Sequence, residues 1–381
     1  MSPSTELNAI VSGIGISRIG RRTGIPPAEL TVEAAHRAIN DAGLQPSDID
    51  GVVTLGVTPP SEAAAVLGIE PSWTGGEMGH HGLLSPVVEA MRAVSGRASR
   101  HVLVFRTVNM MGGEAMAEGG SLDAMPPAMR DIARLLTMHA YAAPNWVAMH
   151  LQRHMHLYGT TREQLGWLAV NSRRNAALNP LAAYQEPLTL DQYLDARFIS
   201  EPLCLYDCDV PVDGSVALIV STGDATADCD HPVRVVAVGG STGSGGWDQR
   251  PDYPRMASAD AAAELWASTD LRPADVDVAE LYDGFTFLTL AWIEALGFCG
   301  DGEAGAFVEG AARIALDGEL PLNTYGGQLS AGRLHGYWLL HEACLQLRGQ
   351  AGERQVPGDP DVAVAAAGGG PIAGCMLLTR V

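Results

Sequence analysis

Side chains that could move protons stand in two short motifs of the sequence. Tyr282 and Asp283 lie in LYDGF, and His335 and Tyr337 lie in GRLHGYWLL. A phenol can donate a hydrogen bond to an oxyanion, and an imidazole that titrates near neutrality can shuttle a proton. We therefore predict Tyr282, Tyr337 and His335 as catalytic residues, with Asp283 as a group that orients them. Each also has a structural interpretation, in which the ring packs in the core or the imidazole caps a helix.

Further candidate residues stand in turns that could hold a substrate. They are His80, His81, Asn323, Gly327, Arg333 and Gly369. His80 and His81 precede a predicted helix at GHHG, and one of them could face a pocket. Asn323 and Gly327 are expected to shape a turn rather than to react. Arg333 could pair with a carboxylate, either of a substrate or of the protein.

The six cysteines give little evidence for a metal or a disulfide. Cys204 and Cys208 in CLYDC have the spacing of half a zinc site, but no second pair with ligand spacing follows. Scattered cysteines without a secretion signal indicate reduced thiols in a cytoplasm. The opening GIGISRIG has no helix directly after it and no partner acid, so nicotinamide binding is not predicted. We expect no metal and no cofactor in this chain.

The charge of the chain excludes some classes of partner. The 381 residues carry 44 acidic and 24 basic side chains, a formal net charge of −20. Such a surface repels phosphate backbones and anionic lipid. No apolar run approaches the ~18–20 residues of a membrane helix. Neither nucleic acid nor a membrane is expected as a partner, and the predicted location is the cytoplasm.

A pattern of strands and helices occurs twice along the chain. LNAIVSGIG (7–15) and VRVVAVGG (233–240) read as buried strands, and TVEAAHRAINDAG (31–43) and ADAAAELWAS (259–268) read as helices. After each helix comes a similar turn. Its shared residues are Leu44, Pro46, Asp48 and Asp50 in the first copy and Leu271, Pro273, Asp275 and Asp277 in the second. This repeat predicts an internal duplication.

The duplication predicts a layered α/β architecture. We place one half at residues 1–230 and the other at 231–381. A long segment at about 107–205 is inserted in the first half, and connections of that length usually cover a site or a partner surface. It begins with MMGGEAMAEGG, which we expect to be a mobile loop, and continues with helical patterns such as NWVAMHLQRHMHLYG.

Two similar halves with these turns resemble the thiolase fold, and the resemblance covers nearly the whole chain. More narrowly, the sequence is similar to the sterol-carrier and lipid-transfer branch of the thiolase superfamily. The motifs that carry this are SGIGISRIGRRTG, TTREQLGWLAVNSRRNAALNPLA (160–182), DCDVPVDGSVALIV (207–220), LYDGFTFLTLAWIEALGFCGDGEAGAFV (281–308) and GGQLSAGRLHG. The last two are the most specific. The resemblance implies an αβαβα arrangement of five layers.

The sequence departs from the thiolase pattern at the reacting groups. Thiolases use a nucleophilic cysteine at a helix N-terminus and a second cysteine as acid and base. These positions fall near Gly79 and Ala366 of this chain, so both thiols are missing. The thiolase Gly-His-Pro turn reads Gly-Arg-Leu at 332–334, and the Asn-Glu-Ala-Phe motif reads Tyr-Asp-Gly-Phe at 282–285. An acyl-cysteine intermediate is then not expected, unless another cysteine, Cys375 or Cys299, reaches the site.

The resemblance implies an aldolase rather than a thiolase. The motifs are similar to those of the side-chain aldolases of bacterial steroid catabolism, which cleave a β-hydroxyacyl-CoA to a 17-ketosteroid and propionyl-CoA. By that likeness the chain would form a homodimer, joined by two small accessory proteins with an OB fold and a zinc ribbon into a heterotetramer. Two alternatives stay open: a thiolase or acyltransferase with a displaced cysteine, and a non-catalytic lipid-transfer or scaffold subunit. Binding of the coenzyme A substrate would need a local basic patch or a partner that supplies one.

Overall fold

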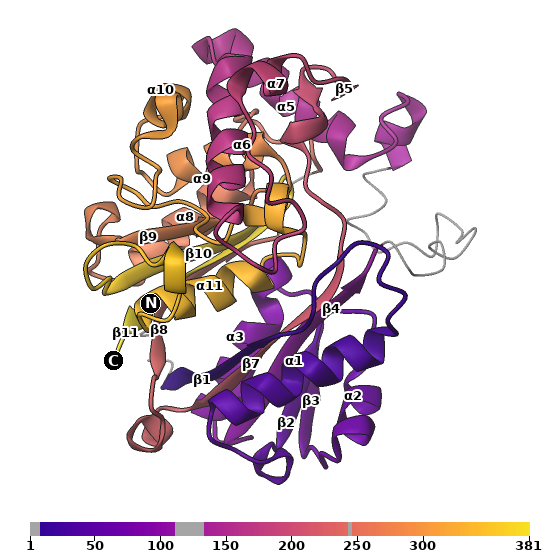
Figure 1. Cartoon of the computed structure of the whole chain (residues 1–381), viewed down its shortest axis with the longest axis vertical. Coiled ribbons are helices and arrows are strands. Elements are labelled where there is room, and N and C mark those ends of the chain that lie inside the picture. The colour runs from indigo at the N-terminus through magenta and orange to yellow at the C-terminus, as the bar shows by residue number, and fades with distance from the viewer. Residues whose placement is uncertain (1–7, 111–132, 243–245) are drawn as a thin grey trace.

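The chain folds into two halves that share one sheet (Figure 1). A computed structural model describes residues 8–110, 133–242 and 246–381. The predicted loop MMGGEAMAEGG therefore lies, from residue 111 onward, outside the described residues. In Figure 1 the N-terminal half forms the lower part, and the C-terminal half and the inserted helices form the upper part.

Nine strands of the described chain form the main sheet, in the order β3-β2-β4-β7-β1-β8-β11-β10-β9. Their bounds are β1 Ala9–Ile16, β2 Gly51–Thr54, β3 Trp73–Gly75, β4 His101–Asn109, β7 Asp213–Thr222, β8 Val233–Ser241, β9 Val278–Leu281, β10 Val362–Gly369 and β11 Ile372–Arg380. A separate hairpin pairs β5 (Phe198–Ser200) with β6 (Leu203–Cys204).

The strand order shows the predicted duplication directly. From β1 outward the first half runs β1-β7-β4-β2, with two antiparallel pairs and then a parallel one. From β8 outward the second half repeats that pattern as β8-β11-β10-β9. The halves meet where β1 pairs with β8 over only two residue pairs. The predicted boundary at residue 230 falls between β7 and β8, and its exact position stays a prediction.

The repeated turns have the same local structure. A short 3-10 helix spans Pro46–Asp48 in the first copy and Pro273–Asp275 in the second. In each, the aspartate accepts a hydrogen bond from the backbone N–H three residues earlier, at 2.8 Å for Asp48 and 2.7 Å for Asp275. The shared Pro and Asp residues thus cap equivalent turns that lead into β2 and β9.

Helices cover both faces of the sheet halves and fill the space between them. The main helices are α1 Pro27–Asp41, α2 Pro60–Leu67, α3 Ser85–Ser95, α5 Ala143–Tyr158, α6 Arg162–Ala176, α7 Leu190–Leu194, α8 Ala257–Ala267, α9 Thr286–Ala295, α10 Ala304–Val308 and α11 Tyr337–Leu347. Helix α1 packs on β1, β7 and β4, and α8 packs on β8 and β11. Helix α11 contacts strands of both halves, so it lies in the central layer. This is the predicted five-layer α/β arrangement.

Glycines in the strands allow close packing on both faces. A Cβ on Gly13 of β1 would lie 2.2 Å from the Ala38 carbonyl of α1, so the glycines of the opening SGIG seat a helix rather than form a nucleotide turn. On the other face, a Cβ on Gly374 of β11 would lie 2.2 Å from the His81 carbonyl. The GHHG turn is therefore packed directly against the second half of the sheet.

The described part of the inserted segment, from residue 133 onward, is largely helical and packs on the C-terminal half. It holds α5, α6 and α7, while its predicted first residues, 107–109, belong to β4. Buried polar side chains of α6 bond the turn before α11: Ser172 donates to the Gly326 carbonyl at 2.5 Å, and Asn175 donates to the Leu322 carbonyl at 3.0 Å. No helix in the described part of the chain is long and apolar enough to cross a membrane.

Candidate active site

The candidate catalytic residues lie at two neighbouring chain segments. Tyr282 and Asp283 follow the last residue of β9, so they leave the sheet at the carboxyl end of a strand. The second segment, 323–337, runs from the end of an extended stretch beside β9 to the first residue of α11. It carries Arg333, His335 and Tyr337.

The turn at the start of the second segment is fixed by its backbone conformation and by the side chain of Asn323. Asn323, at a φ of +49°, donates its amide to the Leu281 carbonyl at 2.9 Å and accepts from the Leu281 N–H at 2.7 Å. Gly327, at a φ of +60°, lies so close to Asp283 that a Cβ there would be 1.9 Å from Oδ2. Both residues shape the turn, as expected, and the amide of Asn323 is engaged by the protein.

Asp283 binds the backbone of the same turn through its carboxylate. Its Oδ1 accepts from the Gln328 N–H at 2.8 Å, and its Oδ2 lies 3.4 Å from the Leu329 nitrogen. The side chain is buried, and this burial raises the pKa of Asp283 to about 7. These contacts fit the orienting role predicted for Asp283.

Both tyrosines are buried in the core of the site. Tyr337 has no exposed surface, and within the described residues its hydroxyl has no hydrogen-bond partner. Burial raises the pKa of both Tyr282 and Tyr337 above the ordinary value, so both phenols are neutral near pH 7. A neutral phenol in this place is a hydrogen-bond donor without a protein acceptor.

His335 contacts an arginine that the sequence interpretation missed. Arg106, on β4, donates from Nη2 to His335 Nδ1 at 2.9 Å. Burial and the cations Arg106 and Arg333 hold the pKa of His335 well below its ordinary value. His335 is therefore neutral at pH 7, and the predicted titration near neutrality is wrong. Arg106 escaped notice because HVLVFRTVN reads as a buried strand, although one charge inside such a strand is itself a signal.

Asp209 is the second residue that the sequence interpretation missed. Its carboxylate pairs with Arg333 at 3.1 Å, and its side chain is 8% exposed. Burial raises the pKa of Asp209 to about 6, although Arg333 opposes the rise. Asp209 stands among three aspartates in YDCDVPVD, and nothing in the sequence separates it from its neighbours. The predicted carboxylate pairing of Arg333 is an internal ion pair.

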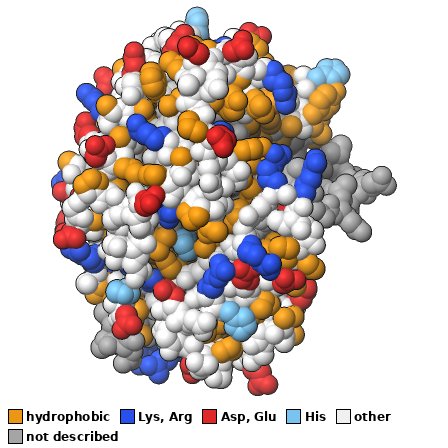
Figure 2. Space-filling model, viewed as in Figure 1, with side chains coloured by type: hydrophobic (Ala, Val, Ile, Leu, Met, Phe, Trp, Pro, Cys, Tyr) orange, Lys and Arg blue, Asp and Glu red, His pale blue; other side chains and the backbone are white. Residues whose placement is uncertain are grey.

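A cavity of about 310 Å³ opens beside these groups. Asp209, Leu329, Arg21 and Arg173 are among the residues that line it. Both guanidiniums lie against the Tyr184 ring, at 5.5 and 5.2 Å from its centroid. Among the described residues no carboxylate forms an ion pair with either arginine. Figure 2 shows basic and acidic side chains mixed over the viewed face of the molecule.

Three predicted residues lie apart from this cluster. His80 is exposed and bonds Glu264 at 2.7 Å, while His81 is buried. Burial and nearby cations lower the pKa of His81 to about 4, so it is neutral. Gly369 packs on Leu288 of α9, where a Cβ would be 2.8 Å from Cδ2. The interactions described for these three residues are with other parts of the protein, not with Tyr282 or Tyr337.

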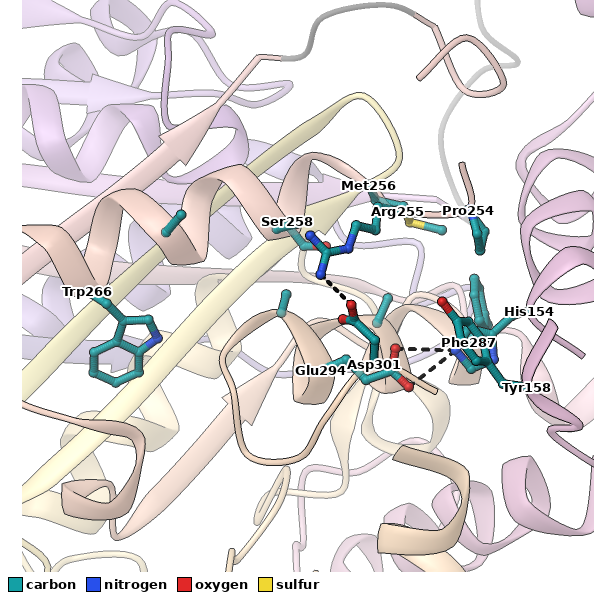
Figure 3. Close-up of a pocket in the computed structure, with 14 residues that line it drawn as sticks. His154, Tyr158, Pro254, Arg255, Met256, Ser258, Trp266, Phe287, Glu294 and Asp301 are labelled. Carbon is teal, nitrogen blue, oxygen red and sulfur yellow. Dashed lines mark hydrogen bonds and ion pairs between the residues drawn. The ribbon is translucent and has the colours of Figure 1, made fainter. Parts of the chain in front are cut away.

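A second cavity, of about 270 Å³, lies between α5, α8 and α9 (Figure 3). Its charged groups already have protein partners. Arg255 pairs with Asp301 at 2.5 Å, and Glu294 pairs with His154 at 3.2 Å. None of the predicted catalytic residues lines this cavity.

Comparison with known proteins identifies the family. Residues 239–378 match the thiolase C-terminal domain-like family. The chain is 35% identical to the steroid side-chain-cleaving aldolase of Thermomonospora curvata, over 97% of both chains. It is 33% identical to the 17-hydroxy-3-oxo-4-pregnene-20-carboxyl-CoA lyase of Mycobacterium tuberculosis, over 97% of this chain and 98% of that one. The chain belongs to the thiolase superfamily.

Solved structures of this superfamily share the fold. The Ltp2-ChsH2(DUF35) aldolase superposes with a TM-score of 0.89 at 33% identity, over 99% of this chain and 98% of that one. Human mitochondrial 3-ketoacyl-CoA thiolase superposes with a TM-score of 0.71 at 15% identity, over 98% of this chain and 99% of that one. The second match shows the fold alone.

The thiols of this superfamily member lie in poor places for nucleophilic attack. Cys375 is buried on β11, 3.9 Å from the Gly239 carbonyl, and Cys299 lies near Glu294, Glu303 and Asp301. Cys208, which the sequence interpretation did not single out as a nucleophile, lines the 310 Å³ cavity. Burial and the neighbouring Asp207 and Asp209 raise the pKa of Cys208 to about 12. A thiol with that pKa is protonated at pH 7 and reacts slowly.

Proposed function

We propose that this protein cleaves the side chain of a β-hydroxyacyl-CoA by a retro-aldol reaction, releasing a ketone and propionyl-CoA. The substrate we propose is a steroid with a tertiary hydroxyl at the β carbon, and the ketone is then a 17-ketosteroid. Two relatives that span nearly the whole chain are named for cleaving a steroid side chain and for a steroid carboxyl-CoA lyase reaction. They support both the reaction class and the substrate class.

One observation carries the proposal: neutral hydrogen-bond donors, rather than an activated thiol, are gathered around Arg106 and near the Arg333–Asp209 pair. Tyr337 has a buried hydroxyl without a partner in the described chain, and His335 is a neutral imidazole. Donors of this kind stabilise an enolate oxygen, and one such donor changes kcat by about 10²–10³. A site with neutral donors and no activated thiol favours enolate chemistry over acyl transfer.

The composition excludes one common aldolase mechanism. Imine-forming aldolases attack a carbonyl with a lysine amine. None of the 24 basic residues of this chain is a lysine, because all are arginine. Carbon–carbon cleavage here must therefore proceed without a lysine Schiff base.

The proposed reaction uses Asp209 as the general base. Its pKa of about 6 leaves it ionised at pH 7 yet basic enough to accept the β-hydroxyl proton. The Cα–Cβ bond then breaks, the ketone forms, and the electron pair moves to Cα as the thioester enolate. Tyr337 and His335 donate to the enolate oxygen, and Tyr282 gives its phenolic proton to Cα. The proton on Asp209 then returns to the Tyr282 phenolate through solvent, so the cycle closes without a redox partner.

Coenzyme A is proposed to occupy the cavity lined by Arg21 and Arg173. Arginine fits phosphate oxygens well because it presents several N–H donors in one plane. In this proposal, Arg21 and Arg173 form the local basic patch that coenzyme A binding requires on a chain with a net charge of −20. The thioester end would then lie near Asp209 and the tyrosines.

A partner subunit is part of the proposal. The structural relative at a TM-score of 0.89 is named as a complex of two components. We propose that two copies of this chain join two small OB-fold, zinc-ribbon proteins in a cytoplasmic heterotetramer, and that this chain itself needs no metal or cofactor. Co-expression with such a protein should raise activity; a monodisperse, fully active isolated chain would exclude a required partner.

Product analysis tests the proposed reaction. The chain, with its partner, is incubated with a 17-hydroxy steroid C20-carboxyl-CoA or C22 thioester analogue, and products are followed by mass spectrometry. We expect a 17-ketosteroid and propionyl-CoA in equal amounts from the substrate with a three-carbon acyl end. Release of acetyl-CoA, or transfer of an acyl group to free coenzyme A, would instead favour the displaced-cysteine thiolase.

A further inference from the structure

Arg106 joins the two halves of the molecule at the catalytic cluster. It lies on β4 of the first half, and its Nη2 donates to Nδ1 of His335, 229 residues later in the chain. Its other titratable neighbours are the neutral Tyr337 and Tyr282 and the cation Arg333. Arg106 is thus the member of the cluster that the N-terminal half supplies from its sheet.

The guanidinium of Arg106 lacks an anionic partner in the described chain. No carboxylate forms an ion pair with it, and its buried Nε has no hydrogen-bond partner. Burying a cation without an anion is unfavourable, so proteins keep such a group where an anion appears or where it fixes another group. The hydrogen bond to His335 identifies the group that it fixes.

That hydrogen bond determines the tautomer of His335. An arginine only donates, so Nδ1 of His335 must accept, and in the neutral ring the proton then sits on Nε2. His335 has a φ of +52°, an uncommon left-handed conformation for a residue other than glycine. The ring is held, its Nδ1 is occupied, and Nε2–H makes no hydrogen bond within the described residues.

We propose that Arg106 is a positioning residue that holds His335 as its neutral Nε2–H tautomer, so that Nε2–H donates to the oxygen of a thioester enolate. The inference rests on the enolate chemistry of the proposed function but not on the steroid. Neutral imidazole donors serve in this way in other enolising enzymes, where an imidazolium would be too acidic. Arg106 belongs to the first half and His335 to the second. The site is therefore complete only when the two halves pack together.

Two variants separate the charge of Arg106 from its hydrogen bond. Arg106→Met removes both, and Arg106→Gln keeps an N–H donor without the charge. Arg162→Met is the matched control, because Arg162 also has a buried Nε without a partner and lies over Tyr193 and Phe198, away from the cluster. All are made in the full chain with its partner, and folding is checked by circular dichroism and melting.

The first measurement is the tautomer itself. Protein labelled with ¹⁵N-histidine is studied by long-range ¹H–¹⁵N correlation, and the His335 signals are those missing in His335→Asn. Wild type and Arg106→Gln should show a single neutral Nε2–H form. Arg106→Met should show mixed tautomers and a His335 pKa closer to the ordinary value, since a neighbouring cation is gone. An unchanged tautomer in Arg106→Met overturns the proposal.

The second measurement is exchange of the α protons of propionyl-CoA in D₂O, which needs only the enolate step. We expect kcat for exchange to fall by about 10²-fold in Arg106→Met and by about tenfold in Arg106→Gln, with KM changed by less than about threefold. Arg162→Met should exchange at the wild-type rate. Loss of exchange in both Arg106 variants with an unchanged His335 tautomer would also overturn the positioning role.

The two measurements separate this inference from the proposed function. Exchange without steroid cleavage would leave the Arg106 assignment standing and remove the steroid aldolase. If Arg106→Met does not fold, Arg106→Leu, which also removes both the charge and the donor, replaces it in both measurements, and an unchanged His335 tautomer in that variant overturns the proposal.

Discussion

At the scale of single residues, the site is defined by which groups are neutral. Burial keeps both Tyr282 and Tyr337 protonated and His335 unprotonated, whereas Asp209, with a pKa of about 6, is ionised at pH 7. One ionised carboxylate thus accompanies several neutral donors, a combination that suits the proposed removal of a hydroxyl proton and capture of an enolate.

Tyr337→Phe tests the donor role most simply. The variant removes one hydroxyl that makes no hydrogen bond in the described protein, so folding should be little affected. We expect kcat to fall by about 10²-fold, the effect of losing one oxyanion donor, with little change in KM. Steady-state kinetics check this, and wild-type turnover would remove Tyr337 from the mechanism.

The pH dependence of the rate tests Asp209. The base must be ionised, so kcat/KM should fall as the pH drops through about 6, the raised pKa of Asp209. Asp209→Asn should lower kcat/KM by at least about 10² at pH 8 and abolish the fall near pH 6. A variant that keeps both the rate and the acidic limb would assign the base to another group, and a limb near pH 7 would point to Asp283.

At the scale of elements, two turns decide where the reacting groups point. Hydrogen bonds fix the turn at 323–331 on three sides. The Asn323 side chain bonds the backbone of Leu281, and Asp283 accepts from the backbone of 328 and 329. Helix α6 bonds the Gly326 carbonyl through Ser172. Glycine is needed at position 327 because the carboxylate of Asp283 occupies the space that a side chain there would fill.

Gly327→Ala tests this packing. The new Cβ would collide with Asp283 and sit at a positive φ, so we expect a loss of about 2–3 kcal/mol in the free energy of unfolding and a large loss of activity. Gly349→Ala is the control, since Gly349 has a similar φ of +67° with nothing within 4 Å, and should lose only about 1 kcal/mol. Urea unfolding measures both, and equal losses would show that only the backbone angle matters.

Periodicity and turn chemistry in the sequence were enough to predict the elements. Strand β8 and helix α8 lie within about two residues of their predicted ranges, and Gly43, the last residue of the predicted helix 31–43, follows the end of α1 with a φ of +70°. The same local signals could not predict contacts between elements far apart in sequence. Arg106 meets His335 across 229 residues, and Asp209 meets Arg333 across 124, so both partners of the predicted residues emerged only in three dimensions.

The burial of each titratable group was equally hidden in the sequence. His335 was expected to titrate near neutrality because an isolated imidazole does so. Burial in the core and the neighbouring Arg106 and Arg333 lower the pKa of His335 far below that of an isolated imidazole. Likewise Cys208 stands in a motif that suggested half a metal site, and only the fold places it on the cavity wall.

At the scale of the whole molecule, the coenzyme A part of the proposed substrate is polyanionic, whereas the chain is strongly acidic. In the proposal, a local pair of arginines that line one cavity, Arg21 and Arg173, bind its phosphates. The net charge of −20 repels the phosphates of coenzyme A at a distance, whereas the two arginines attract them at contact. The balance predicts that affinity depends on one small patch.

Arg21→Gln tests the patch. Losing one phosphate contact should raise the Kd for coenzyme A by about tenfold, or about 1.4 kcal/mol, with little effect on kcat. Arg22→Gln is the matched control, because Arg22 is the exposed neighbour and does not line the cavity. Isothermal titration calorimetry distinguishes them, and equal changes in both variants would show that only net charge matters.

The central claim is that cleavage passes through a free enolate and never through an acylated cysteine. Single-turnover cleavage in D₂O, followed by mass spectrometry of both the product and the intact chain, tests it most directly. We predict propionyl-CoA that carries one deuterium at Cα and a protein mass that stays unchanged at every time point. An acyl adduct that forms and decays with the reaction, on Cys208 or any other cysteine, would contradict the claim.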